Sequence, residues 1–368
     1  MYQDSRIGVR FRTRQAAHDL RVLSAPRSWS GLTPAWMTDA LTPHFPGAVV
    51  TDVWIGDVAD GTNRRATVRL RYQSVPGPER VFVKREGRVL NRLALSALGA
   101  LESEARLFDS GVQLPLEHAR PYAAGVDRWR LSTVVVMEDV TLRSGDPNAA
   151  TRPLTVGQVQ SGLRGLARLH AAYWDQPLPE PMQFLRPWKL SSAWAPLSLA
   201  SLARARRLLR VGHARTLPAL PSAATLERGF RRWATIAASG PQTVLHGDPH
   251  PGNTYALPDD VTGFYDWQLV RTGNWSHDVG YFIAASMDVA DRRAHERSLL
   301  RYYLDELTKA ETPAPDFEGA WQLYRLTPAF GLGTWLHTLS GGGFQPIEEC
   351  LATIERFAAA YGDHEIGF

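Results

Sequence analysis

A predicted β-hairpin over residues 254–265 restricts the fold of this chain more than any other feature. Two runs typical of short strands, residues 254–257 and 261–265, flank a Pro-Asp-Asp turn. Such a pattern is a hairpin signal. Because a hairpin returns the chain beside its own start, we expect the polar residues before and after it to face one another across a gap.

The residues on both sides of this hairpin suit phosphoryl transfer. Before it runs His-Gly-Asp-Pro-His-Pro-Gly-Asn, which places Asp248 five residues before Asn253, and after it comes Asp266 in an Asp-Trp-Gln triplet. This five-residue separation is that of the catalytic base and the magnesium-binding asparagine in a kinase catalytic loop. We therefore predict Asp248 as the general base, and Asn253 and Asp266 as ligands of the Mg²⁺ that accompanies ATP.

The first third of the chain predicts a small sheet. A helix should begin at Pro34, with Thr33 as its N-cap, and another is expected over residues 96–108. Alternating or buried apolar runs predict four strands, over residues 49–55, 66–72, 81–84 and 131–137. This order is that of a kinase N-lobe. We assign residues 1–44 to an N-terminal arm and helix, and residues 45–138 to a nucleotide-binding N-lobe.

The rest of the chain, residues 139–368, predicts a helical C-lobe that holds the catalytic loop and binds the substrate. Residues 178–197, rich in proline and tryptophan, are expected to form a loop. Eight helices are predicted, over residues 156–172, 201–211, 225–238, 279–287, 294–309, 317–326, 330–339 and 347–361. Thr327-Pro328 is interpreted as a break, since proline disfavours helix in the residue before it. The predicted class is α+β: a two-lobed protein-kinase-like fold with an antiparallel-sheet N-lobe.

A lysine at the end of the third predicted strand, Lys84, is the candidate for binding the ATP phosphates. Cations on the phosphate oxygens stabilise the transferring group. Such a lysine needs a carboxylate to fix it, and Glu104 on the following helix is our candidate. Glu102 is the alternative, because two residues apart on a helix the side chains point in different directions.

Two further segments are candidates for contact with the nucleotide. Gly61-Thr62-Asn63-Arg64-Arg65, at the end of a turn-rich loop, has backbone amides that could bind phosphate oxygens. Because no Gly-x-Gly-x-x-Gly occurs, a plain hairpin loop is an equal alternative. Met137, Glu138 and Val140 lie where the lobes would join, and their backbone would contact the adenine edge.

Three more residues near the catalytic segment are expected to have structural roles. Asp278, twelve residues past Asp266, should accept hydrogen bonds from the catalytic-loop backbone. His246 should hold the loop by hydrogen bonds. His250 is interpreted as a loop residue, because the glycine and proline between it and His246 break any helix that would align the two on a metal.

Together these motifs resemble the aminoglycoside phosphotransferase and choline kinase superfamily, most closely its ecdysteroid-kinase-like branch. The resemblance rests on His246-Gly247-Asp248, Asn253, Asp266-Trp267-Gln268 and Asp278-Val279-Gly280-Tyr281-Phe282, and it spans roughly residues 50–282. It implies an ATP-dependent small-molecule kinase that transfers the γ-phosphoryl group to a substrate hydroxyl. A catalytically inactive kinase-like binding protein is one alternative. A protein kinase is a weaker one, since glycine follows His246 where protein kinases have arginine.

Composition restricts the setting of the chain. No apolar run reaches the roughly 18 residues of a membrane-spanning helix, and the polar N-terminus lacks a signal-peptide core. The single cysteine, Cys350, excludes an intrachain disulfide and a cysteine-based zinc site. The net charge of +4 over 368 residues is small for a nucleic-acid-binding protein. We expect a cytoplasmic protein with a small-molecule partner, and neither the acceptor nor the oligomeric state is predicted.

Overall fold

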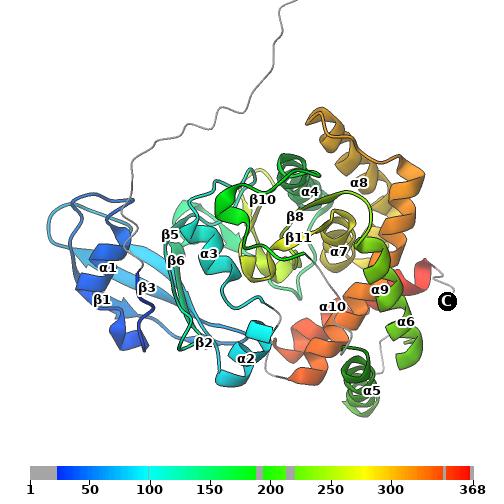
Figure 1. The fold of residues 1–368 in the computed structure, drawn as a ribbon, viewed down its shortest axis with the longest axis horizontal. Helices are drawn as coiled ribbons and strands as arrows, with labels where there is room; N and C mark the ends of the chain where they lie inside the picture. Colours follow the sequence, from blue (N-terminus) through cyan, green and yellow to red (C-terminus); the bar gives the residue numbers. More distant parts are fainter. Residues whose placement is uncertain (1–22, 98, 188–193, 213–219, 343–344, 365–368) are drawn as a thin grey trace, which may run out of the picture.

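The computed structural model describes residues 23–97, 99–187, 194–212, 220–342 and 345–364. Figure 1 shows a sheet-bearing part built from the N-terminal third and a larger, mainly helical part built from the rest. This confirms the predicted α+β class with an antiparallel sheet followed by a helical region. The predicted arm falls largely on residues 1–22, which lie outside the described residues.

An antiparallel sheet with strand order β1-β3-β4-β6-β5 forms the N-terminal part. Its strands are β1 (Val50–Ile55), β2 (Ala59–Asp60), which pairs with β3, β3 (Arg64–Tyr72), β4 (Arg80–Arg85), β5 (Pro121–Asp127) and β6 (Ser132–Glu138). Helix α1 (Pro34–Leu41) begins as predicted, with the Thr33 hydroxyl accepting from Trp36 N at 3.2 Å. Met37 and Leu41 of α1 pack against alternate sheet residues such as Val68, so one face of the sheet is buried.

The predicted helix over residues 96–108 is wrong as a single element. Two helices occupy this region, α2 (Val89–Ala97) and α3 (Ser103–Asp109). Gly99 has a φ of +68°, and the N–H groups of Gly99 and Ala100 donate to the carbonyls of Ser96 and Leu95. This is the glycine-based pattern that ends helices. Strand β5 was not predicted, because its alanines and glycine carry no alternating apolar signal.

The helical part is built around α7 (Ser276–Ser286), all of whose residues are buried. One apolar core joins α7 to α4 and α8, and a second joins it to α5, α6, α9 and α10. The surrounding helices are α4 (Val156–Ala172), α5 (Trp194–Gly212), α6 (Ala223–Ala237), α8 (Val289–Lys309), α9 (Phe317–Gly341) and α10 (Ile347–Asp363). In the described part of the chain, no helix combines the length and the apolar character needed to cross a membrane.

Two predictions in the helical part are wrong. Helix α9 continues through Pro328 instead of breaking there. Proline in a helix interior costs about 3 kcal/mol, but α9 buries residues on both sides of it, including Tyr324 and Leu332, in the two cores. Burial of such side chains stabilises by about 1.5–3 kcal/mol each, which offsets the loss. Helix α5 starts at Trp194, inside the predicted loop. The described part of that loop contains the short 3₁₀ turn Glu180–Met182, and residues 188–193 lie outside the described residues.

The predicted β-hairpin over residues 254–265 is confirmed. Strands β9 (Thr254–Leu257) and β10 (Val261–Phe264) pair antiparallel, with Leu257 opposite Val261. Asp259 and Asp260 in the three-residue turn both have positive φ, a conformation that aspartate adopts more readily than most residues. The short strand β7 (Asp146–Pro147) extends this sheet. Strand β8 (Gln242–Leu245), just before the hairpin segment, pairs with β11 (Arg271–Asn274), just after it.

Candidate active site

A cleft of about 1040 Å³ lies between the sheet and the helical part. Its lining comes from β3 and β4, from the end of β6 and from the segment around the β9–β10 hairpin. Nine of the residues predicted to act at the site line it: Gly61, Thr62, Asn63, Lys84, Met137, Glu138, Val140, Asn253 and Asp266. The two others, Glu104 and Asp248, contact residues of this lining: Glu104 pairs with Lys84, and Asp248 accepts from Asn253.

Lys84 lies between two carboxylates. Its Nζ is 2.7 Å from Glu104 Oε2 and forms an ion pair with Asp266 Oδ1. Glu102, the alternative partner, instead pairs with Arg128 at 3.0 Å. Burial opposes the charge on Lys84, but Asp266 and Glu104 together raise its pKa above the ordinary value. The lysine is therefore a fixed positive charge at the cleft wall.

Asp266 occupies a strained position after β10. Its φ of 64° is in the left-handed region, which non-glycine residues adopt rarely and which clusters at functional sites. Burial acts to raise the pKa of its carboxyl, but the neighbouring Lys84 lowers the pKa below the usual range. The carboxylate is therefore ionised at neutral pH and directed at the cleft, as a ligand of a hard cation needs to be.

The backbone of the predicted catalytic loop donates hydrogen bonds to Asp278, as expected. Asp278 Oδ2 accepts from His246 N at 2.6 Å, and Oδ1 accepts from Gly247 N at 3.0 Å. Gly247 has a φ of +87°, and a Cβ there would lie 2.1 Å from Leu269 O, so no larger residue fits. His246 Nε2 lies 3.1 Å from Tyr265 O. These contacts place the start of the loop independently of any ligand.

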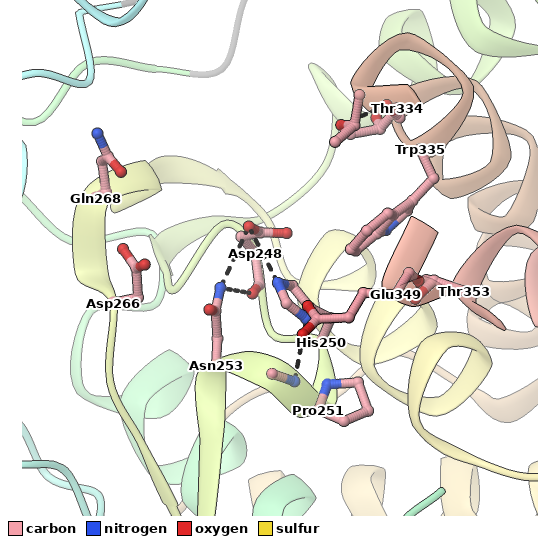
Figure 2. A network of polar contacts seen from close by, with 12 residues as sticks. Asp248, His250, Pro251, Asn253, Asp266, Gln268, Thr334, Trp335, Glu349 and Thr353 are labelled. Atoms are coloured by element: carbon pink, nitrogen blue, oxygen red, sulfur yellow. Dashed lines mark hydrogen bonds and ion pairs between the residues drawn. The ribbon is translucent and has the colours of Figure 1, made fainter. Parts of the chain in front are cut away.

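Asp248 has polar partners on both sides of its carboxylate. Tyr281 Oη donates to Oδ1 at 2.9 Å, and Asn253 Nδ2 donates to Asp248 O at 2.9 Å and lies 3.3 Å from Oδ2. Figure 2 shows Asp248 between Asn253 and His250, with Asp266 across from them. Burial raises the pKa of Asp248 to about 7. A carboxyl with a pKa near neutrality both accepts and releases a proton readily, which suits a general base.

Asn253 combines with Asp266 to offer oxygen ligands. It ends the short 3₁₀ turn Pro251–Asn253, and its amide nitrogen is used by Asp248. This orientation leaves the amide oxygen for a cation. A carboxylate and an amide oxygen that line one cleft fit Mg²⁺, which prefers oxygen ligands and keeps several waters or phosphate oxygens.

The predicted phosphate loop is the tip of the β2–β3 hairpin. Asn91 Nδ2 donates to the carbonyl of Gly61 at 3.2 Å, and Asn63 Nδ2 donates to Gln268 Oε1 at 2.8 Å. The loop is thus tied to the start of α2 and to the turn after Asp266. Both interpretations, a phosphate loop and a plain hairpin, are compatible with this position at the cleft.

Several residues at the site were not predicted to act there. Gln268 and Tyr281 belong to the motifs that carry the resemblance, but no role was predicted for them. A signal for Tyr281 was present, because it follows Asp278 by three residues and residues at this spacing are neighbours on a helix surface. Arg65, the last residue of the predicted phosphate loop, had been considered only for its backbone, but it lines the cleft from β3, where it pairs with Lys84 of the adjacent strand β4. Trp335 of α9 contacts Tyr281, and no local pattern marks it.

Comparison with known sequence families shows to which family the chain belongs. The sequence model of the Phosphotransferase enzyme family matches residues 62–318, which is more than two thirds of the chain and includes all the predicted site residues but Gly61. The chain belongs to the phosphotransferase enzyme family. This confirms the resemblance to the aminoglycoside phosphotransferase and choline kinase superfamily, while the ecdysteroid-kinase-like branch stays a prediction.

Solved structures of other phosphotransferases share the fold. A spectinomycin phosphotransferase in complex with ADP and spectinomycin is 14% identical, with a TM-score of 0.50 over 89% of this chain and 98% of that one. An ethanolamine kinase from Plasmodium vivax is 13% identical, with a TM-score of 0.51 over 90% and 86%. A choline kinase from Cryptosporidium parvum is 9% identical, with a TM-score of 0.50 over 90% and 95%. A search of curated proteins finds no match.

Proposed function

We propose that this phosphotransferase transfers the γ-phosphoryl group of ATP to a hydroxyl group of a small molecule. The observation that carries the proposal is the convergence of Lys84, Asn253 and Asp266 on one cleft, with Asp248 bonded directly to Asn253. A lobe of residues 45–138 would bind the nucleotide, and residues 139–368 would supply the catalytic loop and the acceptor site. Residues 1–44 would form the arm and α1.

Charged side chains would bind the phosphates of the nucleotide, and backbone groups would contact its base. Lys84, fixed by Glu104, would neutralise phosphate oxygens, and Gly61-Thr62-Asn63 would cover them. Backbone groups of Met137, Glu138 and Val140, where β6 leads into the helical part, would contact the base. Asn253 and Asp266 would hold Mg²⁺, which when bound neutralises charge on the β- and γ-phosphates.

Asp248 would act on the acceptor hydroxyl. As the hydroxyl oxygen bonds to the γ-phosphorus, the bond from that phosphorus to the bridging oxygen breaks and ADP leaves with the electron pair. The hydroxyl proton passes to Asp248. The spectinomycin phosphotransferase with the same fold is seen with ADP and an acceptor together, which supports a nucleotide donor. ATP is abundant in the cytoplasm, where we place the protein.

The direct test is an acceptor screen with the purified chain, ATP and Mg²⁺, following ADP release. The panel holds choline, ethanolamine, other alcohols, aminoglycosides including spectinomycin, macrolides, sterols and generic peptides. We expect ADP release to depend on one small-molecule class and on Mg²⁺. Phosphorylation confined to peptides would indicate a protein kinase, and nucleotide binding without turnover of any acceptor would indicate an inactive binding protein.

A variant at the base tests the mechanism within that screen. General-base assistance contributes about 10²–10⁴-fold to such reactions, so Asp248→Asn should lower kcat by that order. ATP affinity should change little, because Lys84, Asn253 and Asp266 remain. A variant that kept its kcat but lost ATP binding would show that Asp248 belongs to the nucleotide site and is not the base.

A further inference from the structure

A chain of two hydrogen bonds leads from the helical core to the carboxylate of Asp248. Trp335 Nε1 of α9 donates to Tyr281 Oη at 2.7 Å, and Tyr281 Oη of α7 donates to Asp248 Oδ1 at 2.9 Å. Tyr281 is 1% exposed and Trp335 is 3% exposed. Three segments far apart in the sequence therefore meet in one polar contact, which is buried at Trp335 and Tyr281 and partly exposed at Asp248.

The direction of these bonds is fixed by the chemistry of the three groups. An indole N–H only donates, and the deprotonated Asp248 carboxylate, which is the form that can act as a base, only accepts. Because Trp335 already donates to the phenol oxygen, the single proton of Tyr281 has to point at Asp248. Burial and the adjacent Asp248 raise the pKa of Tyr281 well above its ordinary value, so the phenol keeps this proton.

The bond from Tyr281 leaves the two carboxylate oxygens of Asp248 with different surroundings. Oδ1 is occupied by the phenol, whereas Oδ2 lies 3.3 Å from Asn253 Nδ2 and 3.8 Å from His250 Nε2. The terminal torsion of an aspartate is broad, so without the phenol only the longer contact with Asn253 Nδ2 would restrain the carboxylate. With the phenol, Oδ2 is the oxygen left for an acceptor hydroxyl.

The helices are packed so that this contact forms. A Cβ on Gly280 would lie 2.5 Å from Thr327 Oγ1, so only glycine allows α7 and α9 to approach this closely. Trp335 lies two turns beyond Pro328 on the uninterrupted α9, and its ring meets that of His250 edge-on, with centroids 5.0 Å apart. Figure 2 shows Trp335 projecting from α9 toward Asp248 and His250.

We propose that Tyr281 and Trp335 are positioning residues, which hold the Asp248 carboxylate so that Oδ2 faces the acceptor hydroxyl. The inference rests on the proposed function and deepens it, because it names the residues that orient the base. Neither side chain needs to touch the nucleotide or the acceptor. Their loss should therefore affect the chemical step and leave ATP binding unchanged.

The experiment is a double-mutant cycle with a matched control. Tyr281→Phe, Trp335→Phe and the double variant are compared with the wild type for kcat and for KM of MgATP, using the acceptor found in the screen or, without one, hydrolysis of MgATP. Tyr324→Phe is the control, because Tyr324 Oη donates to Glu296 at 2.8 Å in a buried phenol–carboxylate bond away from the cleft.

Misplacing a reacting group by about 1 Å can lower a rate about 10²-fold. We expect Tyr281→Phe to lower kcat by about 10- to 100-fold with an unchanged KM for MgATP, and Trp335→Phe to lower it several-fold. In the Tyr281→Phe background, Trp335→Phe should have no further effect, because its influence passes through the phenol. Tyr324→Phe should lower the melting temperature as Tyr281→Phe does, yet keep its kcat.

Three results would overturn the inference alone: an unchanged kcat in Tyr281→Phe, a rise in KM for MgATP in place of a fall in kcat, or effects on kcat that multiply in the double variant. If Tyr281→Phe is unfolded at the assay temperature, Trp335→Phe provides the test, because it keeps the Tyr281 phenol. An unchanged kcat in Trp335→Phe would then refute the inference that the two hydrogen bonds position Asp248. A wild-type chain that neither phosphorylates an acceptor nor hydrolyses MgATP would overturn the proposed function and this inference together.

Discussion

Replacing Asp278 by asparagine should destabilise the whole protein through the catalytic loop. The Asp278 carboxylate is fully buried and accepts from His246 N at 2.6 Å and Gly247 N at 3.0 Å, with His277 Nδ1 at 3.1 Å and His170 Nε2 at 3.4 Å. An amide of the same shape has one oxygen, so its NH₂ group must face one of these donors. At least one backbone N–H then loses its partner.

The size of the effect follows from these contacts. A buried donor left unpaired costs about 1–3 kcal/mol, and hydrogen bonds to a charged acceptor contribute about 1.5–3 kcal/mol where neutral ones contribute about 1. The Asp278→Asn variant should therefore lose about 2–5 kcal/mol of its free energy of unfolding. This is a large share of the roughly 5–15 kcal/mol of a typical domain.

The same contacts predict how the effect depends on pH. Burial acts to raise the pKa of Asp278, but the hydrogen bonds from His170 and His277 hold it well below its usual range. A depressed folded-state pKa contributes stability above the unfolded-state value of about 3.9, and this stability is lost as the pH falls below it. The difference in free energy of unfolding between wild type and variant should have its full size at neutral pH and should become smaller below about pH 4.

Urea unfolding at neutral pH and below about pH 4 measures both quantities. The exposed Asp305 on α8 offers a control, because Asp305→Asn makes the same change of charge without burial. A loss in Asp278→Asn no greater than in Asp305→Asn would refute the reasoning. So would a gap that stays constant through the acid range, because it would show that the ionised carboxylate is not what holds the loop.

Three further predictions concern the cleft and the helical core. Asp266→Ala should abolish Mg²⁺-dependent turnover while far-UV circular dichroism and cooperative melting persist. Glu104→Gln should raise the KM for MgATP, because Lys84 loses one of its two ionic partners; an unchanged KM would remove Glu104 from the site. Gly280→Ala should lower the free energy of unfolding by about 1–3 kcal/mol, since its Cβ would clash with Thr327; urea unfolding that shows no loss would contradict the close packing.

Local patterns were sufficient to predict much of the site. The hairpin and the spacing around it bring Asp248, Asn253 and Asp266 together, because a two-strand turn determines its own geometry within a few residues. The contact between Lys84 and Glu104 also followed from the order of strand and helix, and the structure chose Glu104 over Glu102. Predictions of this kind depend on residues that are close together in the sequence, so one amino-acid sequence is enough to make them.

What the sequence did not reveal depends on contacts between distant segments. Pro328 was interpreted from its local preference, but burial on both sides of it keeps α9 continuous. The bond from Trp335 to Tyr281 joins residues 54 positions apart. Strand β5 forms because β6 offers a free edge, not because its own residues favour strand. In each case tertiary packing outweighed a weak local preference.

The Asp266-Trp267-Gln268 turn is where the sheet and the catalytic segment are joined. Each of its residues contacts a different element of the N-terminal part: Asp266 pairs with Lys84 of β4, Trp267 N donates to Glu104 of α3, and Gln268 accepts from Asn63 at the β2–β3 tip. A turn held by three elements at once places the proposed metal-binding carboxylate and the predicted phosphate loop in a fixed relation. A nucleotide bound as proposed would compete with Asp266 for Lys84. The strained Asp266 would therefore couple nucleotide binding to the packing of the sheet-bearing part against the helical part. Loss of this side chain should accordingly alter turnover and the approach of the two parts together, whereas loss of Asp248, which contacts none of these three elements, should alter turnover alone.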